Sequence, residues 1–208
     1  SGLSLLYVQE GSSRFFVDGL EQLTLTRYVV GVDGVVAPDD SLRFAALGFS
    51  RAQRLAANVF GGDDRAYLVD ASSLQLVRWN PDEMVIEETT SLPELMRDEG
   101  ALVYPPVVRE GVAYFPFAYF DPTEDRIRPE AVVLVLDLED GSYSVTADDS
   151  CGDAIYGYLH TTGDIYFASG TANGAMEEIE REGAGPSCLR RIPAGSRSFD
   201  AAYHPTIA

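Results

Sequence analysis

Residues 110–145 read EGVAYFPFAYFDPTEDRIRPEAVVLVLDLEDGSYSV, and this stretch indicates the fold of the whole chain. Residues 112–120 form a β-branched and aromatic run, which is typical of a strand. Residues 131–138 are apolar enough for a strand that is buried on both faces. Between them, residues 121–130 form a polar segment with two prolines. The stretch therefore predicts two strong strands joined by a charged loop.

A tight turn follows the second of these strands. Gly141 supplies the left-handed backbone conformation that a short hairpin needs, so we expect Leu138 and Tyr143 to face each other across antiparallel strands. Comparable strands recur at intervals of 51, 46 and 53 residues, beginning at Phe15, Ala66, Val112 and Ile165. Each of these strands is paired with a preceding strand in one hairpin and is followed by a second hairpin. The repeat is therefore four antiparallel strands.

Four strands in every fifty residues or so are the signature of a β-propeller, in which each repeat forms one blade. A β-sandwich with evenly spaced strands is the rival fold, but it does not predict a matched pair of hairpins in every repeat. We therefore predict an all-β, single-domain propeller over residues 1–208, with about four blades. The expected blades are residues 3–46, 54–91, 101–147 and 154–207. We expect these blades to be part of a larger propeller, or half of a ring that another chain completes.

The charge of the chain is strongly negative, with 33 acidic and 15 basic residues and a net charge of −18. Such a surface repels a phosphate backbone and anionic lipid, so nucleic acid is excluded as a partner. All the basic residues are Arg, which reflects genome composition or salt adaptation better than a binding function. An acidic surface also discourages association between sheets with exposed edges.

Two insertions distinguish the last two repeats. In each of them the loop between the second and third strands is longer by ten or more residues, and these loops are residues 121–130 and 171–187. In a propeller such loops emerge on the same face as the connections between blades, which brings Cys151 and Cys188 to this face. We predict a disulfide between them, and hence an oxidising compartment, although a pair of free buried thiols is the alternative.

The same face carries the candidate ligand-binding residues. These are Asp121, Glu124, Asp125, Asp148, Asp149, Asp153 and Asn173. Clustered carboxylates suit calcium, which prefers oxygen ligands, but no complete calcium-loop pattern is present and solvated loops explain the clusters as well. No other cofactor is predicted. The insertions either meet a ligand or cover an exposed edge of the propeller.

Catalytic motifs are few. Residues 48–52 lack the second Gly of a nucleophile elbow, and neither His160 nor His204 has a nucleophile beside it in sequence. We therefore expect a non-enzymatic binding or scaffold module, with a metal-assisted hydrolase or lyase as the alternative. Tyr156 and Tyr158 share one face of a strand, where a core stripe is favoured over the lining of a central channel. Trp79 is expected to pack between blades.

Two segments carry a family resemblance. Residues 65–84, RAYLVDASSLQLVRWNPDEM, and residues 154–171, AIYGYLHTTGDIYFASGT, resemble the MxcI-like propeller lipoproteins of myxobacteria, named from a member encoded with myxochelin siderophore biosynthesis. The resemblance implies an extracytoplasmic protein, membrane-anchored in its full-length form, with no established activity. The enlarged loops predict that it binds a small molecule or protein partner, and a link to siderophore or metal uptake is the expected context. The resemblance implies no catalytic residues. The lipobox cysteine and first blades of such a protein are missing, in keeping with a fragment.

Overall fold

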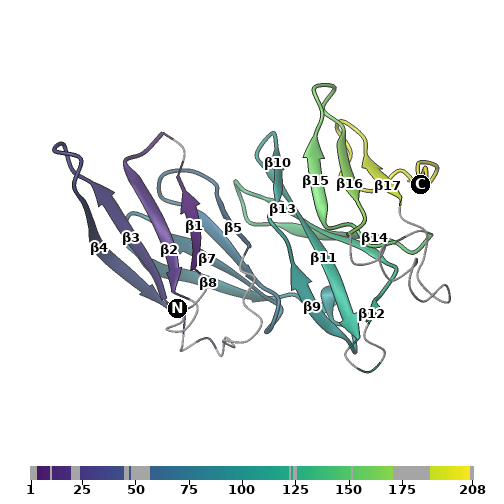
Figure 1. Ribbon diagram of the computed structural model, residues 1–208, viewed down its shortest axis with the longest axis horizontal. Coiled ribbons are helices and arrows are strands. Elements are labelled where there is room, and N and C mark those ends of the chain that lie inside the picture. Colours follow the sequence, from purple (N-terminus) through teal and green to yellow (C-terminus); the bar gives the residue numbers. More distant parts are fainter. Residues whose placement is uncertain are drawn as a thin grey trace. The chain divides into compact units, whose positions relative to one another are not determined.

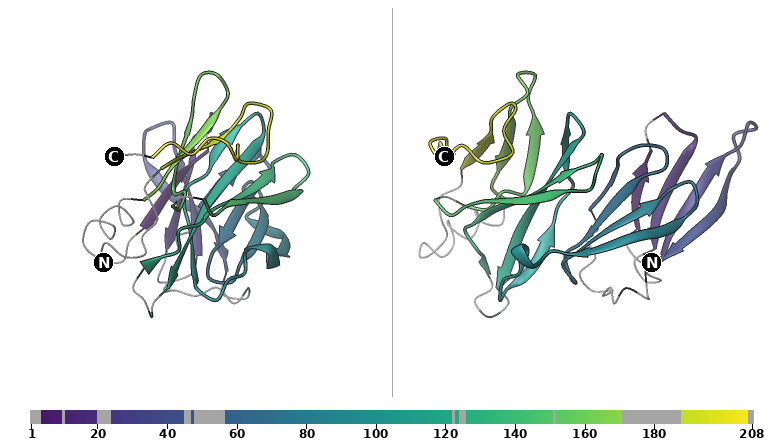
Figure 2. Two further views of the ribbon diagram at one scale, coloured as in Figure 1. Left: turned by 90° about the vertical axis from the view of Figure 1, so that its right-hand side faces the viewer. Right: turned by 180° about the vertical axis from the view of Figure 1, so that it is seen from behind.

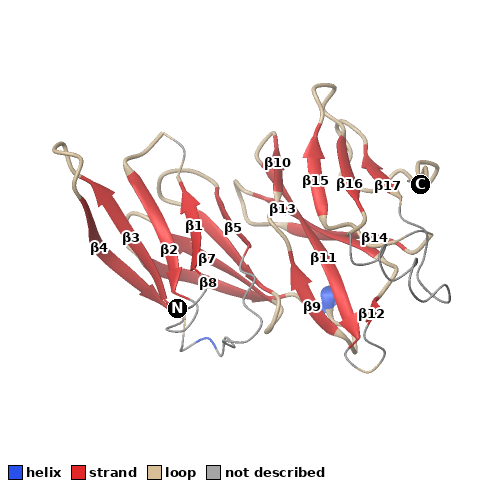
Figure 3. Ribbon diagram, viewed as in Figure 1, coloured by secondary structure: helices blue, strands red, loops and turns tan. Residues whose placement is uncertain are grey.

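The computed structural model describes residues 4–9, 11–19, 24–44, 47, 57–121, 123, 126–150, 152–170 and 188–206. These residues form four antiparallel sheets that follow one another along the chain (Figures 1 and 3). A short 3-10 helix, η2 (Pro93–Leu95), forms a single helical turn after β8. Among the described helices, none has the length and apolar character needed to cross a membrane.

Two compact units divide the chain, Ser1–Ser91 and Leu92–Ala208. The first unit holds two four-stranded sheets, each with its strands in sequence order. The strands of the first sheet are β1 (Ser4–Val8), β2 (Arg14–Gly19), β3 (Thr24–Val30) and β4 (Val36–Arg43). Those of the second sheet are β5 (Ala57–Phe60), β6 (Ala66–Asp70), β7 (Gln75–Asn80) and β8 (Val85–Ser91). Neighbouring strands within each sheet pair antiparallel, as the predicted hairpins require.

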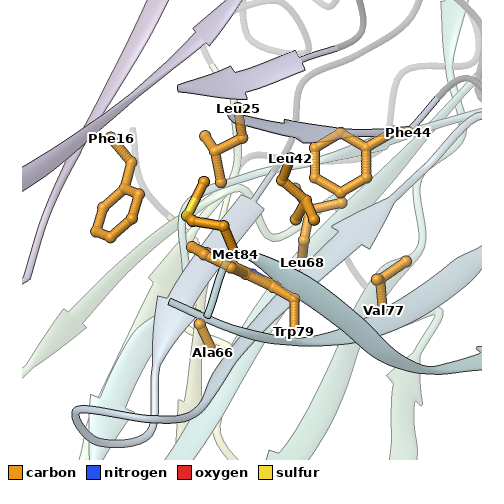
Figure 4. Close-up of a cluster of buried hydrophobic side chains, with 9 residues drawn as sticks. All are labelled: Phe16, Leu25, Leu42, Phe44, Ala66, Leu68, Val77, Trp79 and Met84. Atoms are coloured by element: carbon orange, nitrogen blue, oxygen red, sulfur yellow. The ribbon is translucent and has the colours of Figure 1, made fainter. Parts of the chain in front are cut away.

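The core of the first unit lies between its two sheets (Figure 4). The first sheet and the residue after it contribute Phe16, Leu25, Leu42 and Phe44, and the second sheet and its turn contribute Ala66, Leu68, Val77, Trp79 and Met84. Trp79 is completely buried, and its indole ring contacts Phe16 edge to face at 5.3 Å. The indole Nε1 donates a hydrogen bond to Asn58 Oδ1 at 3.1 Å. The predicted packing role of Trp79 is confirmed.

The second unit holds the third and fourth sheets, which Figure 2 shows from two further sides. The strands of the third sheet are β9 (Gly100–Val103), β10 (Val107–Arg109), β11 (Val112–Asp121), β12 (Arg126–Ile127), β13 (Ala131–Asp137) and β14 (Tyr143–Asp148). Those of the fourth sheet are β15 (Tyr156–Leu159), β16 (Ile165–Ala168) and β17 (Leu189–Ile192). Both β9 and β10 pair with β11, so together they are one edge strand interrupted by Pro105 and Pro106.

The third sheet buries its central strands on both faces, as the apolar run predicted. Every residue from Ala131 to Leu136 is buried. One face packs against the fourth sheet through Tyr114, Val133, Ile165 and Phe167, among others. The predicted class is therefore confirmed: the chain is an all-β propeller with about four blades of antiparallel strands.

The fourth blade departs from the expected four regular strands. Residues after β17 still follow that strand, because the Asp200 N–H donates to the Arg191 carbonyl at 2.8 Å and the Leu189 N–H donates to the Pro205 carbonyl at 3.1 Å. A bridge between Cys188 and Thr206 continues the pairing. Pro205 has no N–H to donate, so this segment cannot form a complete ladder.

Two predicted details are wrong. Tyr143 faces Leu136 instead of Leu138, because the turn uses two more residues than expected, although Gly141 takes the expected left-handed conformation with φ of 77°. Tyr156 and Tyr158 are 56% and 62% exposed and do not form a core stripe. In their strand the inward position belongs to Gly157, where a Cβ atom would lie 2.4 Å from Val107 Cγ2.

Candidate functional site

A buried ion pair fixes the connection that leads into the fourth blade. Arg190, in β17, is completely buried, and its Nη1 lies 3.2 Å from Asp148 Oδ2 at the end of β14. The same Nη1 donates to Ser150 Oγ at 2.9 Å. Asp148 Oδ1 accepts hydrogen bonds from the Ser150 N–H and hydroxyl at 2.9 and 2.7 Å. These bonds hold residues 148–150 against the fourth sheet.

The electrostatics of this pair keep the carboxylate ionised. Burial alone would raise the pKa of Asp148, but the two Ser150 donors and the charges of Arg190 and His204 outweigh it, and the pKa lies below its ordinary value. Burial lowers the pKa of Arg190, while Asp148 and Asp149 raise it. Asp149 itself is exposed. It is therefore the member of this acidic group that a ligand can reach.

Asp153 plays a different part, although sequence placed it in the same cluster. It is completely buried, and its Oδ1 accepts the Gly170 N–H at 2.9 Å. Burial, together with the charges of Asp153 and Tyr156, raises the pKa of Tyr104. Asp153 thus holds the connection that leads into the fourth blade against Gly170, directly before the 171–187 insertion.

Both ends of the second insertion meet at one place. The Ser169 N–H donates to the Cys188 carbonyl at 3.3 Å, and the Cys188 N–H donates to Ser169 Oγ, also at 3.3 Å. Cys188 is completely buried, and no cysteine among the described residues is free. Its expected partner Cys151 lies outside the described residues, so the disulfide stays a prediction. Asn173, within the insertion, also lies outside them.

The first insertion begins with a locally satisfied carboxylate. Asp121 ends β11, and its Oδ1 accepts hydrogen bonds from the Thr123 N–H and hydroxyl at 2.8 and 2.6 Å. β12 then pairs with the end of β11, so part of the expected loop is strand. Glu124 and Asp125 lie outside the described residues. Asp121 therefore shapes the turn that leads into this insertion.

Asp121, Asp148 and Asp153 accept hydrogen bonds from the protein itself. Within the part of the chain that the structure describes, no group of three or more His, Cys, Asp or Glu side chains is arranged to hold a metal ion. Calcium binding that uses Glu124 or Asp125 stays a prediction. What the structure brings together is Asp148, Asp149, Asp153 and the two ends of the 171–187 insertion.

Sequence reasoning missed an aromatic group on the outward face of the fourth sheet. The ring of His160 lies 6.5 Å from Tyr158 and 6.1 Å from Tyr166, and Tyr166 lies 5.8 Å from Tyr203. The guanidinium of Arg191 stacks over Tyr203 at 4.6 Å. The signal in the sequence is the alternation of Tyr156, Tyr158 and His160, which is typical of one strand face, but only the packing of the opposite face on the third sheet shows that this face points outward.

Comparison with known proteins identifies solved structures with a similar backbone fold. No protein-family model matches the chain. No curated protein matches it either. Among solved structures, it is similar to a protein of unknown function from Bacteroides caccae, with a TM-score of 0.56 and 10% identity over 98% of this chain and 68% of that one. A functionally unknown protein from Desulfotomaculum acetoxidans has a TM-score of 0.53 and 13% identity over 96% and 58%.

The extracellular domains 1–2 of Drosophila semaphorin 1b are also similar, with a TM-score of 0.50 and 11% identity over 91% of this chain and 40% of that one. The chain thus spans less than two thirds of the Desulfotomaculum and semaphorin structures and about two thirds of the Bacteroides structure. At such low identity, the likeness concerns the path of the backbone alone. It places this chain beside larger all-β proteins in fold.

Proposed function

We propose that this chain is a non-enzymatic binding or scaffold module on a β-propeller, and that a small molecule or protein partner meets its loop face. One observation carries the proposal: the connection at residues 148–153 and both ends of the 171–187 insertion are tied together. Arg190 holds Asp148, and Asp153 holds Gly170. Strands in this fold are committed to packing, whereas loops that a rigid scaffold positions are free to bind.

The charge of the chain supports a cationic or metal-laden ligand. A net charge of −18 attracts cations over a long range, and Asp149 presents an exposed carboxylate at the proposed face. An iron-loaded siderophore is the ligand class that the resemblance to MxcI-like proteins suggests. An extracytoplasmic location, with a membrane anchor in the full-length protein, is part of the same proposal, and the expected disulfide agrees with it.

The proposal is tested by calorimetric titration of the purified chain with iron-loaded myxochelin, iron-free myxochelin and calcium chloride, each at low and at physiological salt. We expect the iron-loaded form to bind more tightly than the iron-free form, and calcium binding to weaken as salt increases, because the attraction between a cation and the acidic face is electrostatic. Asp149→Asn should weaken binding by about 1.5- to 5-fold, since an exposed ion pair contributes about 0.2–1 kcal/mol.

Asp40→Asn is the matched control, because Asp40 is an exposed carboxylate of β4 in the other unit. It should leave binding unchanged. Equal weakening by both variants would mean that net charge alone attracts the ligand, and the proposed face would then be wrong. If neither the siderophore nor calcium binds, the ligand class is wrong.

A further inference from the structure

Part of one face of the first sheet, over β1, β2 and β3, is apolar and open to solvent. Its members, which we call the first-sheet face, are Leu6, Val8, Phe15, Val17 and Tyr28. Leu6 and Val8 are 60% and 63% exposed, and the rings of Phe15 and Tyr28 stack at 5.3 Å. None of the five is charged, and the same face continues through Thr24, Thr26 and Ser41 to Arg43 at the far edge of the sheet. Depletion of charge over an exposed apolar patch is typical of the centre of a protein interface.

The fourth sheet also has an outward face, of a different character. Its members, which we call the fourth-sheet face, are Tyr156, Tyr158, His160, Tyr166 and Arg191. The opposite side of the same sheet packs on the third sheet through Ile165, Phe167 and Ile192. In both units, therefore, one sheet packs on the next and leaves an outward face with large exposed side chains.

In each unit, a similar hydrogen bond joins the unit's first sheet to its second. Gln9 follows β1, is buried, and donates from Nε2 to the Gly62 carbonyl in the first turn of the second blade, at 3.1 Å. Arg109 ends β10, is buried, and donates from Nη1 to the Gly163 carbonyl in the first turn of the fourth blade, at 2.8 Å. The two bonds span 53 and 54 residues, close to one repeat. The end of each first strand thus reaches the first turn of the following blade.

His160 occupies the corresponding position in the fourth blade, directly after β15. It is exposed, and its Nδ1 accepts the Thr162 N–H at 3.3 Å. In the tautomer in which Nδ1 accepts this bond, Nε2 carries the proton and can donate outward. In the first blade, the turn that would receive such a bond is residues 11–13, at the edge of the first-sheet face.

We propose that the fourth-sheet face of one copy of this chain docks on the first-sheet face of a second copy. The contact continues the packing that each unit already shows, with the outward face of one blade covering the apolar face of the next. His160 donates to a carbonyl of the first turn in the partner, as Gln9 and Arg109 do within the chain. Because the two faces differ, the contact is head to tail, and it builds a closed pair or a longer assembly.

Sedimentation velocity over a wide concentration range tests the proposal. We expect the chain to form dimers or larger head-to-tail assemblies. Val8→Asp should leave only monomer with an unchanged far-UV circular dichroism spectrum, because it buries a charge in the contact. The control Val32→Asp, at a fully exposed hairpin tip, should associate like the original chain. His160→Ala should weaken association about fivefold, the effect of one lost hydrogen bond.

Cysteine trapping identifies the faces. A mixture of a Val8→Cys chain with a Tyr158→Cys chain should form a mixed disulfide dimer faster than either chain alone forms its own. A chain that stays monomeric at all concentrations overturns the proposal, as does faster trapping of Val8→Cys with itself. Trapping within one chain that carries both substitutions, without any between chains, also overturns it, because the fourth sheet of the same chain would then cover the face.

Discussion

Replacement of Trp79 by Phe should destabilise the first unit by about 2–5 kcal/mol. The indole is completely buried and is the hydrogen-bond donor to Asn58 Oδ1 at 3.1 Å. A buried acceptor that loses its donor costs about 1–3 kcal/mol. The smaller ring also leaves unfilled volume beside Phe16 and Phe60, whose centroids lie 5.3 and 6.1 Å from the indole, and this costs about 1–2 kcal/mol more.

Urea unfolding followed by far-UV circular dichroism measures the loss, because the variant has no tryptophan fluorescence. Asn58→Leu in the Trp79→Phe background removes the orphaned amide, so the double-mutant cycle should show a coupling of about 1 kcal/mol or more between the two residues. A Trp79→Phe variant within about 0.5 kcal/mol of the original chain would fall in the range of ordinary surface changes. That result would refute the reasoning that this indole joins the two sheets.

Three further predictions concern the second unit. The folded-state pKa of Asp148 is depressed, so its stabilisation is present above the unfolded pKa of about 3.9 and is lost as pH falls through the folded value. Asp148→Asn should therefore lower the free energy of unfolding at pH 7. In urea titrations, the free energy of unfolding of this variant should also fall less steeply between pH 5 and 3 than that of the original chain. Intact mass with and without reductant should show a Cys151–Cys188 disulfide, whose reduction costs about 4 kcal/mol in the chain-entropy model; two thiols that alkylate without reductant would contradict it. Gly157→Ala should cost about 1–3 kcal/mol in thermal or urea unfolding, because its Cβ would collide with Val107 Cγ2, and a neutral effect would contradict the close packing of β15 on β10.

Sequence was sufficient for the repeat because that signal is local. Strand runs, turn glycines and their spacing are read within one repeat, so the starts of β2, β6, β11 and β16 could be placed within a residue or so. The pairing register between the strands was predicted less accurately than their starts. The turn before Tyr143 uses two more residues than expected and shifts its partner from Leu138 to Leu136. The propensities of the residues in a turn do not determine how many residues the turn uses.

The candidate site was less accessible to sequence because its bonds are not local. Asp148, Asp149 and Asp153 look alike as a cluster of carboxylates, yet one pairs with a buried Arg190, one is exposed and one is buried against Gly170. The partners of Asp148 and Asp153 lie 42 and 17 residues away along the chain. Tyr156 and Tyr158 were assigned to the core because alternation reveals a shared face and not its direction. The direction of the face is set by packing against the third sheet, where the close approach of Val107 leaves no room for a side chain at Gly157.

The fixed carboxylates also limit how the proposed face can select a ligand. Asp148 and Asp153 already accept donors from the protein, so a cation would have to compete with Arg190 or with the Gly170 N–H to reach them. Displacing such a partner leaves a buried group unsatisfied, which costs more than an exposed contact returns. A ligand at this face therefore gains most from Asp149 and from the insertions at residues 121–130 and 171–187. Replacing the insertions should change which ligand binds, whereas replacing Asp148 or Asp153 should change how well the blade folds.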